Sequence, residues 1–309
     1  MRYASDASMS RSAVAFTAVL AGALGVACAK SASVMPVMGS QSNSNRALPS
    51  WLLGVWRREW IERGGVRTSP YIVRYLQTPE LFADVRLPID RPKFLHARSF
   101  TELTDGELRI LAKQRGFIGR TTIEGLVSTW HHELDFQPPD PEADIGRIER
   151  KGTGRMYEHG LDGSFTEAWV SLTSGDNRFL AVRVERAGRL DQILLVAGDY
   201  FFYGRNRAKD LPAAASLDSL IATTRATRSQ IIAYLDCELS VGRIRGSSTS
   251  WEVQYSTLPW REARELDFVG RIKTGGSVGG LAPLVEPGEI WTVPVNTLSS
   301  EDLILLFAS

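Results

Sequence analysis

From Trp51 onward the chain carries short runs rich in aromatic and β-branched residues, and Gly, Pro, Asn and Asp interrupt these runs. Runs of this length and composition are typical of β-strands. Consecutive runs such as residues 179–186 and 192–197 are separated by turns too short for a crossover helix, so neighbouring strands must pair antiparallel. The sequence therefore predicts an all-β fold with minor α content, in which an antiparallel meander closes into a barrel.

Three helical segments are expected to interrupt the meander. Thr104 and Glu107 have the spacing of a capping box at the start of the first helix. Residues 216–235 carry apolar side chains at helical spacing and predict one long helix after the main meander. Ser299 can cap a short C-terminal helix. Residues 270–280 are rich in glycine and are expected to form a mobile loop.

The first 29 residues have the pattern of a targeting segment, because two arginines precede an uncharged, alanine-rich run. A flexible polar linker at residues 30–50 and a single barrel domain at residues 51–309 should follow. Cleavage after Ala29 predicts a secreted or periplasmic protein, whereas cleavage before Cys28 would leave a lipid anchor on that cysteine. An organelle-targeted protein, or a cytoplasmic one whose start lies downstream, is the alternative. No membrane-spanning helix is expected.

Charge and motifs exclude several function classes. The chain has 36 Lys and Arg against 35 Asp and Glu, so no net field would attract nucleic acid. It has no phosphate-binding G-x-x-x-x-G-K-[ST] loop and no C-x-x-C pair, and the glycine-rich residues 275–280 lack the strand-to-helix context of a phosphate cradle, so no cofactor is expected. Removal of Cys28 with the targeting segment would leave Cys237 without a disulfide partner.

Strand alternation places charged residues among aromatic ones on faces that should point inward. Trp56, Arg58 and Trp60 alternate along the first strand, and Glu167 and Trp169 share a face of a later one. A buried charge is costly unless it is paired or hydrated. These faces predict a cavity with polar groups inside a barrel. A closed core in which Arg58 and Glu167 pair with each other is the alternative.

The two adjacent histidines cannot share one metal ion, because neighbouring residues of a strand point to opposite faces. His132 shares its face with Trp130 and is either a satisfied histidine or a group that contacts ligand or transfers a proton. No metal site is expected. Asp84 and Arg86 also share a face, where pairing with charges of neighbouring strands is expected.

Two segments resemble motifs of the lipocalins and their calycin relatives. Gly54-Val55-Trp56 resembles the G-x-W motif, whose tryptophan closes one barrel end beneath an arginine from a late strand. Gly198-Asp199-Tyr200 is similar to the T-D-Y turn, with Gly in place of Thr. The resemblance implies a lipocalin-like barrel closed by Gly54, Trp56 and Arg205.

A wider resemblance covers roughly residues 51–261. The segments that begin at Tyr75, Asp135 and Ser256 are similar to parts of a poorly characterised group of lipocalin-like proteins. The strands predicted beyond the long helix bring the total above the eight of a plain lipocalin. The sequence is therefore compatible with a larger barrel or with two joined barrels.

Two functional hypotheses from different classes follow. As a binding protein, the barrel would hold a small hydrophobic or amphipathic molecule whose acidic group is oriented by Arg58 or His132. As an enzyme of the cyclase or isomerase type, it would use His132 and Glu167 for proton transfer. No acid–base pair is fixed by local spacing, which favours binding, and a structural barrel with a filled core is a third reading. The predicted ligand-binding residues are Arg58, Trp60, Tyr75, His132, Glu167, Trp169, Phe202 and Trp251.

Overall fold

The computed structural model describes residues 47–173, 178–245 and 250–307. The predicted targeting segment at residues 1–29 and all but the end of the linker at residues 30–50 lie outside the described residues. In the part of the chain that the structure describes, no helix is long and apolar enough to cross a membrane.

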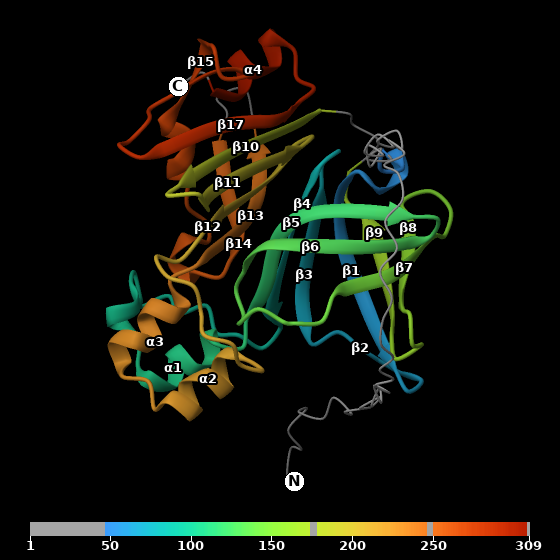
Figure 1. Ribbon diagram of the computed structural model, residues 1–309, viewed down its shortest axis with the longest axis vertical. Helices are drawn as coiled ribbons and strands as arrows, with labels where there is room; N and C mark the ends of the chain where they lie inside the picture. Colours follow the sequence, from blue (N-terminus) through green and yellow to red (C-terminus); the bar gives the residue numbers. More distant parts are fainter. Residues whose placement is uncertain (1–46, 174–177, 246–249, 308–309) are drawn as a thin grey trace, which may run out of the picture. The chain divides into compact units, whose positions relative to one another are not determined.

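Eight antiparallel strands close into a barrel, which confirms the predicted meander (Figure 1). Each strand pairs with the next along the chain, and β9 pairs back with β1 to complete the ring. The short strand β2 (Val66–Thr68) forms a hairpin with the end of β1. The barrel strands are β1 (Gly54–Arg63), β3 (Tyr71–Gln77), β4 (Leu81–Pro88), β5 (Arg115–Glu124), β6 (Val127–Asp135), β7 (Asp144–Arg150), β8 (Arg155–Gly160) and β9 (Thr166–Ser171).

The later strands form a separate six-stranded antiparallel sheet in the order β14-β13-β12-β11-β10-β17. Within the described residues its edge strands β14 and β17 do not pair with each other, so this sheet stays open. The sequence was compatible with one larger barrel or with two joined barrels, and the structure forms neither. The strands are β10 (Phe179–Arg186), β11 (Arg189–Ala197), β12 (Tyr200–Arg205), β13 (Glu238–Arg245), β14 (Ser250–Ser256) and β17 (Glu289–Asn296).

The α-helices are short and begin at side-chain caps. The predicted capping box of Thr104 and Glu107 is present. The region predicted as one long helix is helical but divided, because Arg225 adopts a left-handed φ of 49° and Thr227 starts a new capping box. The α-helices are α1 (Asp105–Leu111), α2 (Leu217–Thr224), α3 (Arg228–Leu235) and α4 (Ser300–Phe307), and the 3-10 helices are η1 (Ser50–Leu52), η2 (Phe100–Glu102), η3 (Pro259–Arg261) and η4 (Asp267–Arg271).

The glycine-rich segment, which was expected to be a loop, forms a hairpin instead. Its strands are β15 (Ile272–Gly276) and β16 (Gly280–Pro283). Glycine suits this pairing because the two backbones approach closely. A Cβ at Gly276 would lie 2.2 Å from the carbonyl oxygen of Leu281. The glycines that suggested a loop therefore permit a tight bulged hairpin.

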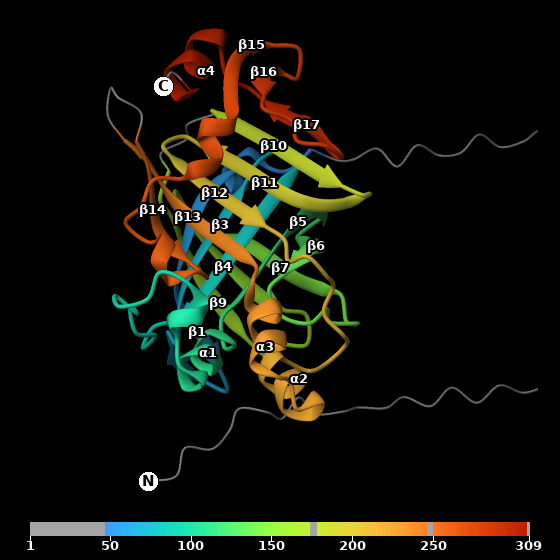
Figure 2. The same ribbon diagram turned by 90° about the vertical axis from the view of Figure 1, so that its left-hand side faces the viewer.

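The largest hydrophobic core lies between the outside of the barrel and one face of the six-stranded sheet. β4 turns Leu81, Ala83 and Val85 outward into this core, and β11 and β13 contact it there (Figure 2). Gly204 of β12 permits the close approach, because a Cβ there would lie 2.2 Å from Cδ1 of Ile118. The opposite face of the sheet is covered by α4, η4 and the β15–β16 hairpin. β4 is consequently buried on both faces.

A β-bulge in β1 decides which of its aromatic side chains enter the barrel. Arg58 pairs with Trp169 of β9, but the register shifts before Trp60, which pairs with Ala168. The extra residue reverses the alternation. Trp60 therefore lies on the outer surface, where its ring contacts Tyr157 and the guanidinium of Arg67. The expectation that Trp60 contacts a ligand inside the barrel is wrong for this reason.

We predict that Trp56→Ala lowers the free energy of unfolding by about 3 to 5 kcal/mol, as expected when a packed core aromatic is truncated. Trp56 is 2% exposed inside the barrel, and its Nε1 donates to the carbonyl oxygen of Leu52 at 2.7 Å. Urea unfolding followed by far-ultraviolet circular dichroism measures the change. Trp60→Ala is the matched control and should cost clearly less. Equal losses in the two variants would contradict the inward and outward assignments.

Candidate functional site

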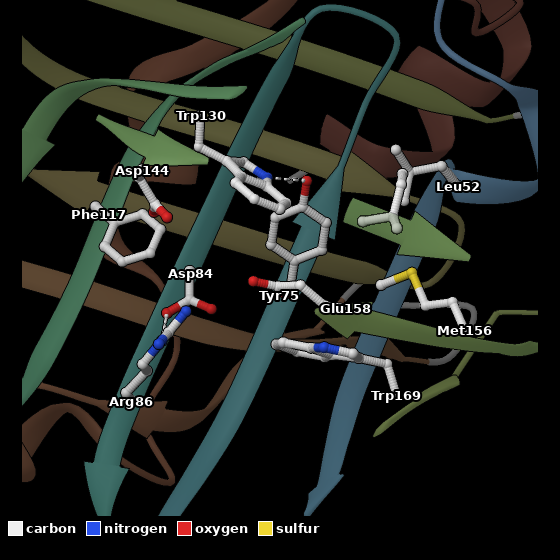
Figure 3. A pocket seen from close by; sticks show the side chains of 11 residues that line it. Leu52, Tyr75, Asp84, Arg86, Phe117, Trp130, Asp144, Met156, Glu158 and Trp169 are labelled. Carbon is white, nitrogen blue, oxygen red and sulfur yellow. Dashed lines mark hydrogen bonds and ion pairs between the residues drawn. The ribbon is translucent and has the colours of Figure 1, made fainter. Parts of the chain in front are cut away.

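The barrel encloses a cavity between aromatic, apolar and charged side chains (Figure 3). Its empty volume is about 360 Å³ including the part that opens to solvent, but only about 20 Å³ can hold the centre of a water molecule. The cavity is thus narrow, with room for roughly one water. Its lining residues are Leu52, Tyr75, Asp84, Arg86, Phe117, Trp130, Asp144, Ile148, Met156, Glu158 and Trp169.

Cross-strand pairing brings these side chains together from strands far apart in the sequence. Tyr75 of β3 pairs with Asp84 of β4, which in turn pairs with Phe117 of β5. On the other side of the barrel, Met156 of β8 pairs with Trp169 of β9. Directly opposed residues of a sheet project to the same face. The lining is therefore a belt of opposed inward residues.

Arg58 and Glu167 form an ion pair inside the barrel, with both side chains 3% exposed. Burial lowers the pKa of Arg58, and the neighbouring Glu167 opposes that shift. Arg58 Nε and Glu167 Oε2 have no hydrogen-bond partner among the described protein atoms. The guanidinium is already neutralised by protein, which agrees with the alternative that the two residues pair with each other.

Asp84 and Arg86 form a second internal pair, with Arg86 Nε 2.8 Å from Asp84 Oδ1. Asp84 is 1% exposed, and its Oδ2 has no partner among the described protein atoms. Burial raises the pKa of Asp84 while Arg86 opposes the rise. Burial also acts to lower the pKa of Arg86, but Asp84 and Glu167 together raise it above its usual range. The expected pairing with neighbouring strands is instead a pairing along β4.

Glu158 lines the cavity, and its carboxyl group has no partner among the described residues. Cross-strand pairing sets it directly opposite Glu167. Among the described residues, no hydrogen bond or ion pair to its carboxyl group is present. Its side chain keeps some accessible surface because it lines the cavity, yet the surrounding atoms withdraw it from bulk water. Burial, and then the charge of Glu167, raise the pKa of Glu158 well above its usual value.

Figure 3 shows the carboxyl groups of Asp84 and Glu158 turned toward the same space beneath the ring of Tyr75. The sequence interpretation did not single out Glu158, and it assigned Asp84 to ion pairing with neighbouring strands and not to the cavity. Alternation of Met156, Glu158 and Gly160 along a recognised strand was the available signal for Glu158.

Tyr75 fixes the aromatic part of the cavity through hydrogen bonds. Its hydroxyl accepts from Nε1 of Trp130 at 3.2 Å and donates to the side-chain oxygen of Gln77. Burial raises the pKa of Tyr75, so the hydroxyl stays neutral. Nε1 of Trp169, by contrast, has no acceptor among the described protein atoms.

His132 lies beside the cavity and holds two carboxylates. Its Nδ1 is 2.7 Å from Asp135, its Nε2 is 3.0 Å from Asp144, and its ring stacks on Phe117. Burial acts to lower the pKa of His132, but hydrogen bonds to Asp135 and Asp144 outweigh it and raise the pKa to about 9. Asp144 lines the cavity, so His132 influences the cavity through its hydrogen bond to this carboxylate. His132 and Glu167 belong to separate ion-pair networks.

The remaining predicted ligand contacts lie outside the barrel. Phe202 is buried in the core between the barrel and the six-stranded sheet. Trp251 lies on the opposite face of that sheet and packs against Phe307. Alternation within each strand does not reveal which of two sheets the strand joins. Of the predicted contacts, Arg58, Tyr75, Glu167 and Trp169 do lie inside the barrel, with His132 beside the cavity.

Of the three residues predicted to close the barrel, Gly54 and Trp56 belong to a barrel strand and Arg205 does not. Trp56 fills the barrel, and Gly54, with φ 119°, leaves space for Thr173, whose Oγ1 would be 2.2 Å from an added Cβ. Arg205 instead lies on β12 of the other sheet and pairs with Asp236 at 2.6 Å. It cannot cover Trp56 because the turn that resembles a lipocalin motif belongs to the six-stranded sheet.

Within the described residues, no group of three or more His, Cys, Asp or Glu side chains is arranged to hold a metal ion. His131 is exposed and its Nε2 lies 2.9 Å from Oγ1 of Thr122, away from His132. Cys237 is buried and free.

Fold and site together define a closed eight-stranded antiparallel barrel with a charged, aromatic-lined cavity, joined to an open six-stranded sheet. No family model matches the chain, and a search of curated proteins found no match. An uncharacterised protein of Saccharomyces cerevisiae, YLR301w, has a similar solved structure with a TM-score of 0.48 and 12% identity, covering 79% of this chain and 98% of the yeast chain. Membership of the lipocalins stays a prediction.

We predict that Arg58→Met lowers the free energy of unfolding by about 3 to 5 kcal/mol, because it leaves Glu167 buried without its partner. Replacing both members, as Arg58→Met with Glu167→Leu, should recover much of that loss. Urea unfolding of the two single variants and the double variant measures the coupling. Arg155→Met is the control, since its pair with Glu59 is exposed and should contribute less than about 1 kcal/mol. Additive losses would contradict the buried pair.

We predict that His132 stabilises the fold at low pH and ceases to do so at high pH. Its pKa is raised in the folded state, so its contribution is complete below pH 6.5 and is lost as the pH rises through about 9. Partial exposure of the side chain, 23%, reduces the contribution to about 1 to 2 kcal/mol. Urea unfolding of the wild type and His132→Gln at pH 6 and pH 10 checks the difference. His131→Gln is the control, and a His132 effect equal at both pH values would contradict the network.

Proposed function

We propose that this chain is a binding protein whose lipocalin-like barrel holds a small amphipathic molecule. The observation that carries the proposal is the cavity itself, which combines aromatic walls with polar atoms that protein leaves unpaired. A filled structural core would be expected to satisfy its buried polar groups, since such groups are nearly always hydrogen-bonded. Asp84 Oδ2 and Trp169 Nε1 border the cavity and are not satisfied by the described protein atoms.

The lining favours a bound molecule that has an apolar body and a polar group. Tyr75, Phe117, Trp130 and Trp169 offer rings to an apolar body, and Ile148 and Met156 extend this surface. Such a mixture of apolar walls and a few polar groups is typical of small-molecule sites. The narrow free space favours a small molecule, or one whose entry moves side chains such as Met156, which is flexible.

An enzyme of the cyclase or isomerase type is the second candidate. The pair first considered for proton transfer, His132 with Glu167, receives no support because the two residues belong to different networks. Glu158 supports this candidate instead. Burial beside Glu167 favours the protonated form of Glu158 in a site with little water, and a general acid must be protonated before it acts. Turnover of a co-purified ligand, lost in Glu158→Gln, would favour this candidate over simple binding.

We predict that native mass spectrometry of the chain from about residue 40 onward, expressed heterologously, detects a retained small molecule. The Met156→Trp variant should fill the cavity with its indole ring and retain less of the molecule. The affinity of this variant for small aromatic probes should be about tenfold or more lower than that of the wild type. Met156→Leu preserves the volume and serves as the matched control. Quenching of tryptophan fluorescence measures affinity, and thermal melts verify folding. A wild type that retains no ligand and binds no probe would support a structural barrel with a filled core.

A further inference from the structure

The charged groups that surround the cavity do not balance. Three carboxyl groups, those of Asp84, Glu158 and Glu167, face two guanidinium groups, those of Arg58 and Arg86. Arg58 pairs with Glu167 and Arg86 with Asp84, so Glu158 is left over. The neighbouring network adds no surplus positive charge to this balance, because the single charge of His132 is shared by Asp135 and Asp144. When every carboxyl group is ionised, this inner set has one negative charge in excess.

Inside the barrel, Nε of Arg58 and Nε1 of Trp169 are unpaired donors, and the unpaired acceptors outnumber them once the carboxyl group of Glu158 is counted. Oδ2 of Asp84 and Oε2 of Glu167 are buried and lack hydrogen-bond partners among the described protein atoms, and the carboxyl group of Glu158 also lacks one. No arginine in this set remains unneutralised. An anionic ligand group would meet these carboxyl groups without compensation, which is strongly unfavourable at low hydration. The expectation that Arg58 or His132 orients an acidic ligand group therefore does not fit this site.

We propose that the molecule bound in the barrel carries a cationic amine, held by the carboxyl groups of Asp84 and Glu158. This inference rests on the proposed binding function and deepens it. An ammonium group has three N–H donors, and charge-assisted hydrogen bonds to carboxylates are stronger than neutral ones. The rings of Tyr75 and Trp169 add favourable faces for a cation. One monovalent cation also removes the excess negative charge.

When the barrel is empty, the same excess charge favours the protonated form of Glu158. The raised pKa of Glu158 is the response of the free protein to the same excess charge. Binding of an ammonium stabilises the ionised form of Glu158, so the protein releases a proton as the amine binds. Affinity for the amine should consequently rise with pH until Glu158 is ionised in the free protein, and should fall once the amine loses its own proton. A ligand that is neutral would show no such proton release.

The test compares three probes of nearly equal shape: 2-phenylethylamine, 2-phenylethanol and phenylacetate. Tryptophan fluorescence and calorimetry at constant ionic strength measure their affinities, and calorimetry in buffers of different ionisation enthalpy measures proton release. We expect the amine to bind at least about tenfold more tightly than the alcohol at pH 8, with phenylacetate weakest. Glu158→Gln should reduce amine affinity about tenfold or more and leave alcohol affinity nearly unchanged. Glu142→Gln, the same substitution in an exposed loop, is the matched control.

The outcomes separate this inference from the proposed function. Alcohol or phenylacetate binding as tightly as the amine would overturn the cationic ligand and leave barrel binding intact. Failure of all three probes to bind would contradict binding of molecules of this size, and the inference with it. If thermal melts show that the Glu158→Gln variant does not fold, proton release by the wild type tests the role of Glu158 in its place. Amine binding without proton release at pH 6 would then overturn the role of Glu158.

Discussion

The burial of β4 on both faces is the constraint on which the rest of the structure depends. Its outward residues, Leu81, Ala83 and Val85, form part of the core shared with the six-stranded sheet. Its inward residues, among them Asp84 and Arg86, line the cavity. A strand fixed from both sides has little freedom to shift its register, because a one-residue slip would exchange the two sets. The charged pair is therefore held in place by apolar packing behind it.

The same constraint explains which parts of the fold could be predicted from the sequence. Short runs and short turns depend on local residues, and they predicted the antiparallel barrel and the capping box of Thr104 and Glu107. The second sheet was not foreseen as a separate sheet. Its strands have the same composition and turns as barrel strands, and only long-range packing around positions such as Gly204 distinguishes them. The prediction of a loop in the glycine-rich segment was wrong for a similar reason, since close backbone approach and loop formation both favour glycine.

Site residues could be predicted where inward and outward side chains alternate regularly along a strand, and could not be predicted where this alternation is interrupted. Arg58, Glu167, Tyr75 and Trp169 were placed inside the barrel correctly by counting every second residue. Trp60 was misplaced because a bulge, which no local motif announced, inserts one residue. Asp84 was assigned to ion pairing and not to the cavity, because the apolar face of β4 is the usual sign of the interior, whereas here that face meets another sheet. An alternation rule assumes that only one face of a strand is buried.

The two sides of the cavity differ in how readily they can yield to a ligand. β3 and β4 are backed by the six-stranded sheet, so moving them disturbs the largest core. On β7 and β8, outward residues such as Ile145 and Arg155 are exposed. Local opening costs least where few buried contacts must break. A molecule larger than the present free space would thus be accommodated by movement of β7 and β8, which carry Ile148 and Glu158, while Asp84 would stay fixed. The proposed site would then have one rigid and one adjustable carboxyl group, so the amine can be positioned by Asp84 before Glu158 gives up its proton.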